Sequence, residues 1–468
     1  MAKKTFRRNH KVRKIHSRKL VIDNQGASSF AGLSLVDQLA SRLGVWSFAR
    51  KVLPARGGRH DRIDIVKGGV AGLLSGSRGT AALEAVRQDD ALVRMMGIES
   101  LPGEKGFWED LAKLGDEQTL KGLHSLCARS ARQVLKKLEP EDLQIEHGFI
   151  PLFGDGTLLE GSQRREGSKA IPKKGSGLMW SAWMLGPMLI GNHLCGEGEG
   201  EQSALFDMLE SVLDDVVDPL GVRDDVLVLM DSLHGDGPSL KRLEAERLMS
   251  IVGANKLDLV KTRLMELPEK AWVKVPENKR RKGLIDEEVC VVYVQCESWD
   301  KKRRVVAKRF RSEGEIIWHH SGVFSSIPPR RLGCSEETDL NYMIRVWNLY
   351  DRKMGMEDQF KDLLTDLCGH NPPCRELVRN RGYYALLSIA FNLARGVDQI
   401  AGLEERRKLR RERARVSLRF RINTLRRHLF ALPGLIRVHS RKLEIRLIGG
   451  GRTHLEWFER WWQALARC

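Results

Sequence analysis

The 468-residue sequence lacks an apolar run of about 18 residues, the length that a membrane-spanning helix needs. The first twenty residues are basic, but no apolar segment with a cleavage site follows them, so they do not form a secretory signal. The eight cysteines have no CxxC spacing, and scattered cysteines of this kind are typical of reduced thiols. These absences predict a cytoplasmic protein.

Clustered zinc ligands are also scarce. Cys368, His370 and Cys374 lie close together and are candidate metal ligands, but the sequence offers no evident fourth ligand. The spacing therefore favours ordinary thiols over a zinc site.

Acidic residues are absent from the first twenty residues and scarce near the other end of a chain whose formal net charge is +18 and whose pI is about 9.6. Residues 1–20 carry nine Lys and Arg and no acid, and residues 406–446 carry fifteen against Glu412 and Glu444. An excess of positive charge favours a polyanionic partner, most simply nucleic acid. Two basic ends around a balanced middle predict arms that grip DNA, and the alternative for the first end is a solubilising tail.

Residues 21–145 have apolar side chains at helical spacing, for example in 33–43 and 63–74. The segment 103–115 is predicted to be a short helix after a turn. It is either the recognition helix of a helix-turn-helix motif or part of an ordinary helical domain. A longer amphipathic helix is predicted over 116–138.

From His147 onward the pattern changes to alternating strands and helices, which predicts an α/β core. The predicted strands are 149–153, two strands in 177–194 around the turn at Gly186-Pro187, 226–230 and 248–253. Helices are predicted over 203–217 and 241–247. Asp231 follows its predicted strand directly, and Asp155 comes two residues after the end of the strand over 149–153.

Residues 263–339 interrupt this core with further strands, predicted over 289–295, 304–311 and 316–323. A long apolar helix over 379–400, a charged helix over 404–427, a strand over 442–448 and a Trp-rich helix over 455–466 follow. The predicted domains are a basic arm (1–20), a helical DNA-binding domain (21–145), the first part of the α/β core (146–262), a β-strand insertion (263–339), the second part of the core (340–400) and a basic C-terminal region (401–468).

The stretch 345–364 is predicted to be one helix that carries Glu357 among cations. Tyr350, Lys353, Glu357 and Lys361 follow one another at steps of three or four, so they share one side of a helix. A carboxylate with cations four residues to either side suits a site for a metal ion and a phosphate. Taken alone, ordinary Glu–Lys pairs on a surface helix explain the pattern better.

Asp155 and Asp231 supply possible partners for Glu357. A scissile phosphate is already anionic, and two Mg²⁺ ions stabilise the attacking and leaving oxygens of an in-line displacement. Mg²⁺ prefers carboxylate oxygens, so three carboxylates from two strands and a helix would suit phosphodiester cleavage and transfer. Other candidates in the same region are Asp225, His234 and Asp236.

Four motifs carry a resemblance to a known family. They are GDGT at 154–157, LVLMDS at 227–232, YDRKMGMEDQFKDL at 350–363 and SIAFNLAR at 388–395. From about residue 21 to 447 the chain resembles the DDE transposases of bacterial insertion sequences. Within them it is most similar to the branch with a Tyr-Arg-Glu-Lys signature and a β-strand insertion before the catalytic Glu. The resemblance implies an RNase H-like core, which is a mixed sheet flanked by helices. It also implies that Asp155, Asp231 and Glu357 are the catalytic and metal-binding residues.

The chain departs from that signature at its cations. Lys353 stands where the family has Arg, with Arg352 beside it, and Leu364 stands where the family has Lys, so that Lys361 is the nearest cation. Lysine keeps the charge but loses the bidentate geometry of arginine toward a phosphate. These changes indicate a divergent branch or a copy that has lost activity.

The resemblance also implies DNA contacts. Tyr350, Lys353 and their neighbours Arg352 and Lys361 would contact phosphates near the cleavage site. Trp299 and Trp318 in the insertion are candidates for stacking on a displaced base, and hydrophobic packing is the alternative that we favour for each.

The resemblance implies a transposase that cuts and transfers strands at the terminal inverted repeats of an insertion sequence. It implies two Mg²⁺ ions, with Mn²⁺ as a substitute, and double-stranded DNA as partner, both at the repeats and at the target. It further implies a homodimer in the DNA complex and a place at the nucleoid. The alternatives are a metal-dependent nuclease without strand transfer and an inactive, transposase-derived DNA-binding protein.

Overall fold

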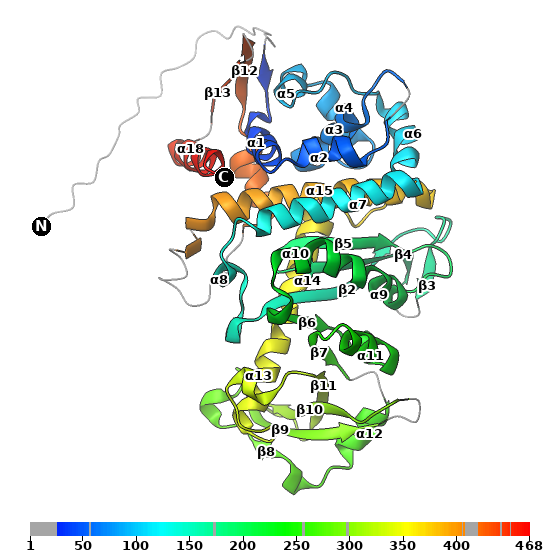
Figure 1. Ribbon diagram of the computed structural model, residues 1–468, viewed down its shortest axis with the longest axis vertical. Coiled ribbons are helices and arrows are strands. Elements are labelled where there is room, and N and C mark those ends of the chain that lie inside the picture. The colour runs from blue at the N-terminus through cyan, green and yellow to red at the C-terminus, as the bar shows by residue number, and fades with distance from the viewer. Residues whose placement is uncertain are drawn as a thin grey trace, which may run out of the picture.

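The computed structural model describes residues 26–55, 58–171, 175–254, 258–295, 299–404, 406–407, 420–439, 442–449 and 451–468. The predicted basic arm and most of the predicted helix over 404–427 lie outside these residues. The described part is elongated, with the N-terminal helices and the C-terminal elements at one end and the strands of residues 273–325 at the other (Figure 1). No helix among the described residues is long and apolar enough to span a bilayer.

The N-terminal part is helical, as predicted. Its helices are α1 (Ser34–Arg42), α2 (Val45–Val52), α3 (Arg62–Ser75), α4 (Ala81–Arg87), α5 (Asp90–Met95), α6 (Glu104–Leu114), α7 (Glu117–Leu135) and α8 (Pro140–Leu143). The Asp61 side chain caps α3 by accepting from the Ile63 N–H, and Gly76 ends that helix with a left-handed backbone (φ 97°). The short strand β1 (Ala27–Ser28) pairs with the C-terminal strand β12 (Gly434–His439), which pairs with β13 (Lys442–Leu447).

Helix α6, the candidate recognition helix, packs closely on α15 (Leu377–Ala401). A Cβ placed on Gly115 would lie 1.7 Å from the Val378 carbonyl oxygen, and one on Gly382 would lie 2.4 Å from the Leu111 carbonyl oxygen. Only glycine allows the two backbones to approach this closely. One side of α6 is therefore fixed in the core, and a role in DNA binding stays a prediction.

A mixed ten-stranded sheet forms the centre of the molecule, in agreement with the predicted fold class. Its strands are β2 (Ile150–Glu160), β3 (Lys169–Ile171), β4 (Gly175–Leu185), β5 (Met188–Leu194), β6 (Val226–Met230), β7 (Met249–Gly253), β8 (Val273–Lys274), β9 (Leu284–Val294), β10 (Arg303–Ser312) and β11 (His319–Ser325). Their order is β3-β4-β2-β6-β7-β11-β10-β9-β8, with β5 paired to β4. The pairs β2–β6 and β6–β7 are parallel, and the other pairs are antiparallel.

The strands of the predicted insertion continue the central sheet. Strand β11 pairs antiparallel with β7, so that Val323 lies opposite Gly253 and Ser325 opposite Ile251. This pairing covers the edge that β7 would otherwise expose. The strands of 263–339 therefore share one sheet with the residues of the predicted core.

Helices pack against the sheet on both sides of β2 to β5 (Figure 1). The predicted long apolar helix is α15. Its Asn392 side chain accepts from the Leu189 N–H in β5 at 3.0 Å and donates to the Leu189 carbonyl at 2.8 Å. The same side chain donates to the Cys127 carbonyl in α7 at 3.1 Å. The remaining helices are α9 (Glu201–Val212), which continues as a π-helical turn (Leu213–Val217), α10 (Asp218–Leu220), α11 (Gly237–Ala245), α12 (Asp258–Met265), α17 (Ile422–Leu425) and α18 (Arg452–Ala466).

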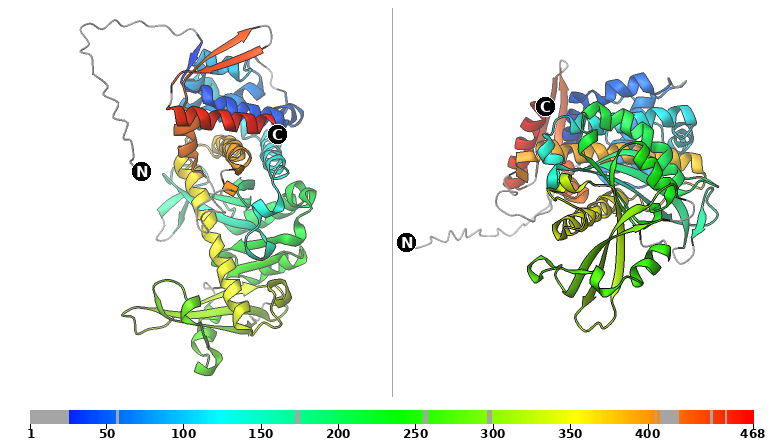
Figure 2. Two further views of the ribbon diagram at one scale, coloured as in Figure 1. Left: turned by 90° about the vertical axis from the view of Figure 1, so that its left-hand side faces the viewer. Right: turned by 60° about the horizontal axis from the view of Figure 1, so that its bottom comes forward.

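The predicted helix over 345–364 is longer and is interrupted. It consists of α13 (Leu340–Tyr350), a 3₁₀ turn (Asp351–Lys353), α14 (Met354–Lys361) and a π-helical turn (Asp362–Asp366). Together they form a column that runs from the β8–β11 end of the molecule toward the C-terminal helices (Figure 2). The 3₁₀ turn falls within the candidate signature residues.

Candidate catalytic site

Asp155 and Asp231 lie side by side because their strands are paired. Strands β2 and β6 are parallel neighbours, and their last paired residues are Gly154 and Met230, each directly before one of the two aspartates. An oxygen of each carboxylate and a ring nitrogen of His234 all lie within 4.8 Å of one another. The two strand positions that the sequence singled out therefore converge.

The glycines of the GDGT motif make room for this arrangement. A Cβ on Gly154 would lie 2.7 Å from the Trp183 ring, and one on Gly156 would lie 2.4 Å from the Glu201 side chain. Trp183 cannot retreat easily, because it is fully buried and its indole N–H donates to the Leu205 carbonyl in α9 at 2.8 Å. The motif thus lets α9 approach the strand that carries Asp155.

Asp155 is paired with Lys353. The Lys353 ammonium donates to Asp155 Oδ2 at 2.8 Å, and the two side chains are 14% and 15% exposed. Burial raises the pKa of the Asp155 carboxyl, the charge of Lys353 opposes that rise, and Asp231 and Glu201 add to it. Lys353 thus supplies part of the positive charge that this buried carboxylate needs.

Asp231 and His234 occupy one short turn after β6. The Asp231 carboxylate accepts from the Leu233 N–H at 2.7 Å and so caps the turn. His234 is fully buried, with its Nε2 3.7 Å from Asp231 Oδ1 and 3.3 Å from Glu201 Oε1. Among the described residues neither ring nitrogen of His234 has a hydrogen-bond partner. The ring can therefore donate a hydrogen bond to one of the two carboxylates or bind a metal ion through a nitrogen.

Glu201 is the acidic residue of this site that the sequence analysis missed. It begins α9, its side chain is 12% exposed, and it lies within electrostatic range of Asp155. An acidic residue in the first turn of a helix is common on electrostatic grounds alone. The available signal was the GEGEGE run before α9, which predicts neither the approach to Gly156 nor the contact with His234.

Tyr350 points toward the same site from the end of α13. A Cβ on Gly253, the last residue of β7, would lie 2.7 Å from the Tyr350 hydroxyl and 2.7 Å from the Ser232 backbone nitrogen. Burial raises the pKa of the Tyr350 hydroxyl, and the charges of Asp231 and Asp155 raise it further. Tyr350 is therefore a neutral donor close to both aspartates.

Glu357 stands in the first turn of α14 and is exposed. Lys353 ends the 3₁₀ turn and Glu357 lies four residues later in α14, about one helical turn away, and Lys353 contacts Asp155. Among the described residues, the metal-capable group around Asp155 and Asp231 does not include Glu357. The structure thus brings two of the three predicted carboxylates together and leaves the third about one helical turn from Lys353.

The two other predicted cations point elsewhere. Arg352 forms a bidentate pair with Glu146, and Lys361 pairs with Asp358 at 3.3 Å. Both cations are exposed. Their contacts with DNA stay predictions.

The two tryptophans of the 263–339 segment are packed in different ways. Trp299 is 7% exposed, and its ring lies 5.5 Å from Phe324 and 5.1 Å from the Arg303 guanidinium, which favours the packing alternative. Trp318 is half-buried, and the guanidinium groups of Arg309 and Arg311 each lie 4.4 Å from its ring. Stacking of Trp318 on a base would require rearrangement of these cations.

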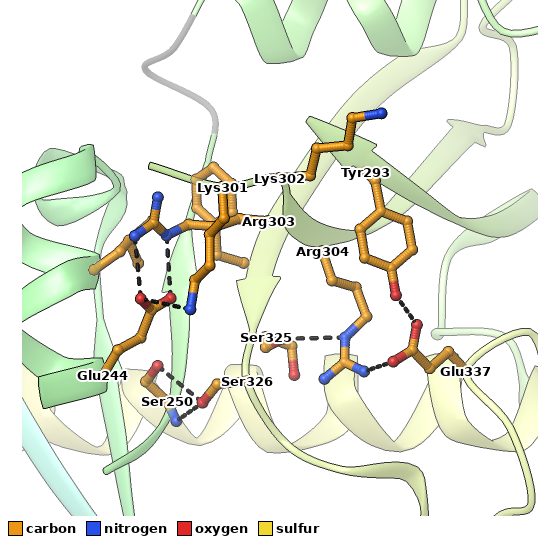
Figure 3. Close-up of a pocket in the computed structure, with 12 residues that line it drawn as sticks. Glu244, Ser250, Tyr293, Lys301, Lys302, Arg303, Arg304, Ser325, Ser326 and Glu337 are labelled. Atoms are coloured by element: carbon orange, nitrogen blue, oxygen red, sulfur yellow. Dashed lines mark hydrogen bonds and ion pairs between the residues drawn. The ribbon is translucent and has the colours of Figure 1, made fainter. Parts of the chain in front are cut away.

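A pocket of about 320 Å³ lies between α11, β7 and the strands β9 to β11 (Figure 3). Four consecutive cations line it, Lys301, Lys302, Arg303 and Arg304. Three acids partly neutralise them. Glu244 meets Lys301 at 3.0 Å and Arg303 at 3.1 Å, Asp300 meets Arg303 at 3.1 Å, and Glu337 meets Arg304 and Tyr293. This basic pocket keeps an excess of positive charge, and Lys302 is exposed.

The donor set around Asp155 and Asp231 fits a divalent metal ion. Carboxylate oxygens suit Mg²⁺ or Mn²⁺, and an imidazole nitrogen is tolerated better by Mn²⁺. One other group among the described residues has metal-ligand geometry, formed by His193, Cys195 and Glu199. Among the described residues, Cys368, His370 and Cys374 do not form such a group.

Comparison with known proteins shows the family of the chain. The family model described as transposase DDE domain group 1 matches residues 200–467, more than half of the chain, including Asp231 and Glu357. A cryo-EM structure of the piggyBac transposase synaptic complex with hairpin DNA is similar, with 12% identity and a TM-score of 0.39 over 86% of this chain and 78% of that chain. No curated protein sequence matches. Through its match to the family model, the chain belongs to the DDE transposases.

Proposed function

We propose that the protein is the transposase of an insertion sequence and that it cuts and transfers DNA strands at the terminal inverted repeats of its element. The observation that carries the proposal is the convergence of Asp155 and Asp231 at paired positions of two parallel strands. The mixed sheet around them supports an RNase H-like core. Double-stranded DNA is the proposed partner, and a homodimer would bring two element ends together.

Metal ions would supply the charge that the reaction needs. Two Mg²⁺ ions, or Mn²⁺ as a substitute, stabilise the attacking and leaving oxygens of a phosphodiester. Asp155 and Asp231 would hold them, and Glu357 would complete the set after a movement of its exposed side chain. The metal ion and the Lys353 ammonium would compete for the Asp155 carboxylate. As the metal binds, the ammonium would leave Asp155 and bind a DNA phosphate.

The chain's own residues would orient the DNA. Tyr350 would donate a hydrogen bond to a phosphate oxygen next to the aspartates, since its hydroxyl is protonated at pH 7 and its raised pKa keeps it so at higher pH. The basic pocket would bind the DNA backbone farther from the cleavage site. Contacts of this kind position DNA without reading its sequence.

The direct test is cleavage of DNA that carries the repeats flanking the gene, with purified protein and Mg²⁺. Asp155→Asn, Asp231→Asn and Glu357→Gln are each expected to lower the cleavage rate at least about 100-fold, because each removes a metal-binding oxygen. Asp358→Asn is the matched control, since Asp358 is the exposed neighbour of Glu357 and pairs with Lys361. Unchanged cleavage in the Asp155 and Asp231 variants would defeat the proposal.

Glu201 is a second candidate for the third carboxylate, because it already lies beside His234 and within range of Asp155. If Glu201→Gln abolishes cleavage and Glu357→Gln does not, Glu201 has that role. Joined products in a target-plasmid assay separate a transposase from a nuclease without strand transfer. Salt-sensitive DNA binding without nicking would indicate an inactive, DNA-binding descendant.

A further inference from the structure

A second cluster of metal-ligand side chains lies in the connection between β5 and α9, outside the proposed catalytic site. His193 is the second-last residue of β5 and is partly exposed, and Cys195 directly follows the strand. Glu199 lies two residues before the start of α9. One ligand atom from each of them lies within 4.8 Å of the other two. His193 Nε2 and Glu199 Oε2 are 2.7 Å apart.

The ligand types fit zinc better than they fit magnesium. Zn²⁺ takes thiolate, imidazole and carboxylate ligands in a tetrahedron, whereas Mg²⁺ prefers oxygen ligands alone. With metal–ligand bonds of about 2.0–2.3 Å, the ligand atoms of a tetrahedral zinc site are about 3.3–3.8 Å apart. The cluster needs only small side-chain movements to reach these separations.

Neighbouring groups hold the ligands in place. The Gly196 N–H donates to Glu199 Oε2 at 2.6 Å, and the Arg381 guanidinium lies 3.1 Å from the same oxygen. The Ser181 hydroxyl lies 3.7 Å from the Cys195 sulfur, which is fully buried. Outer contacts of this kind orient ligands in metal sites.

Space for a fourth ligand lies next to the cluster. A pocket of about 200 Å³ is lined by His193 and Glu199 together with Ser203, Ala204, Asp207 and Met208 of α9. A water molecule can enter it, because its volume is many times that of one water. The geometry therefore offers three protein ligands and one open position.

We propose that His193, Cys195 and Glu199 bind one Zn²⁺ ion, with water as the fourth ligand. Binding replaces the proton of the Cys195 thiol by the metal and releases that proton to solvent. The ion would fix the loop over 195–200, and Glu201 follows this loop directly and contacts His234. The zinc would thereby set the position of Glu201 without taking part in DNA cleavage.

The test measures zinc in the full-length protein, purified with zinc present and then desalted, by mass spectrometry of the metal. About one ion per chain is expected in the unchanged protein and in Asp231→Asn, which excludes zinc held at the catalytic site. Cys195→Ser and His193→Asn are expected to lose most of it. Cys334→Ser is the matched control, because Cys334 is a buried thiol outside the cluster.

Replacement by Co²⁺ gives a readout that needs no variant. A thiolate-to-cobalt charge-transfer band is expected in the unchanged protein, and added zinc should remove it. Absence of this band, absence of bound zinc, or equal zinc in Cys195→Ser and Cys334→Ser would each overturn the proposal and leave an ion-pair cluster with Arg381. None of these measurements uses DNA, so the zinc site and the proposed transposase activity can fail separately.

Discussion

Lys353 is the cation that pairs with one of the two converging aspartates. Its ammonium lies 2.8 Å from Asp155 Oδ2. A lysine at this place acts as a single mobile charge, because its ammonium lacks the fixed fork of a guanidinium. It can stabilise Asp155 before the metal arrives and move away afterwards.

Lys353→Met is expected to strengthen Mg²⁺ binding because it removes a competing cation. At pH 8 and without DNA, the Mg²⁺ concentration that gives half-maximal thermal stabilisation should fall about tenfold, which corresponds to about 1.4 kcal/mol. Thermal unfolding over a series of Mg²⁺ concentrations measures this. Lys361→Met is the control, since Lys361 is exposed and pairs with Asp358. Equal Mg²⁺ dependence in all three proteins would show that Lys353 does not compete with the metal.

The sequence predicts some site residues and not others for physical reasons. Asp155 and Asp231 were predictable because each follows an apolar strand, and parallel neighbours bring such positions together. Glu201 was not predictable, because its position in the site depends on how closely α9 packs against Gly156. That contact joins two elements, and no local sequence pattern encodes it. The burial of Trp299 against Phe324 likewise depends on the pairing of β11 with β7.

At the scale of the elements, the helical column from α13 to α14 connects strands β8 to β11 to the candidate site. Lys308 of β10 points at this column, with its ammonium 3.9 Å from the Trp347 ring centre. Arg281 lies 5.7 Å from the same ring and pairs with Asp351 at 2.6 Å. Burial lowers the pKa of Lys308 to about 8, with Arg281 contributing and Asp351 and Glu287 opposing.

The lowered pKa of Lys308 predicts a specific pH dependence of stability. Below pH 8 the folded chain carries the cost of a buried charge. Between about pH 8 and 10.5 the folded chain has lost the proton that the unfolded chain keeps, so rising pH stabilises the fold through this group. Lys308→Met should raise the free energy of unfolding at pH 7 by about 1–3 kcal/mol, allowing for the lost contact with Trp347.

Urea unfolding at pH 7.5 and pH 9.5 tests this prediction. The difference in free energy of unfolding between Lys308→Met and the unchanged protein should shrink as the pH rises. Lys274→Met is the matched control, since Lys274 lies on the same sheet and is 64% exposed. A difference that stays constant between the two pH values would contradict the lowered pKa.

Element boundaries follow the sequence where one local cause dominates. Strand β6 has the predicted bounds because all five of its residues are apolar and buried. Strand β2 extends well beyond the predicted 149–153, because its glycines stay in the ladder opposite Trp183 and Ser181 of β4. The helix over 345–364 was predicted unbroken because the 3₁₀ turn at 351–353 has no proline or glycine to announce it.

At the scale of the whole molecule, a buried ionic network ties three distant segments together. Arg395 of α15 is fully buried, pairs with Asp362 at the end of the helical column and lies 3.0 Å from Asp398. Its guanidinium also donates to the Phe420 carbonyl at 2.7 Å. Arg421 pairs with Asp366 at 2.7 Å and so adds the C-terminal segment to the same network.

Arg395→Met is expected to destabilise the fold by about 3–5 kcal/mol, because it leaves buried carboxylates without their main partner. The midpoint of urea unfolding measures the loss. Arg452→Met is the comparison, since Arg452 is 93% exposed and pairs only with Glu456 among the described residues, so a change below about 0.5 kcal/mol is expected. Similar small changes in both variants would show that the network contributes little.

The central claim is that Asp155 and Asp231 share a divalent metal ion. Crystals grown with Mn²⁺ test it most directly through anomalous scattering, which locates the ion without reference to any assumed chemistry. The account predicts a peak between the two carboxylates, with the Lys353 ammonium moved away from Asp155. The absence of a peak between the two carboxylates, or Lys353 still bonded to Asp155 in saturating Mn²⁺, would contradict it.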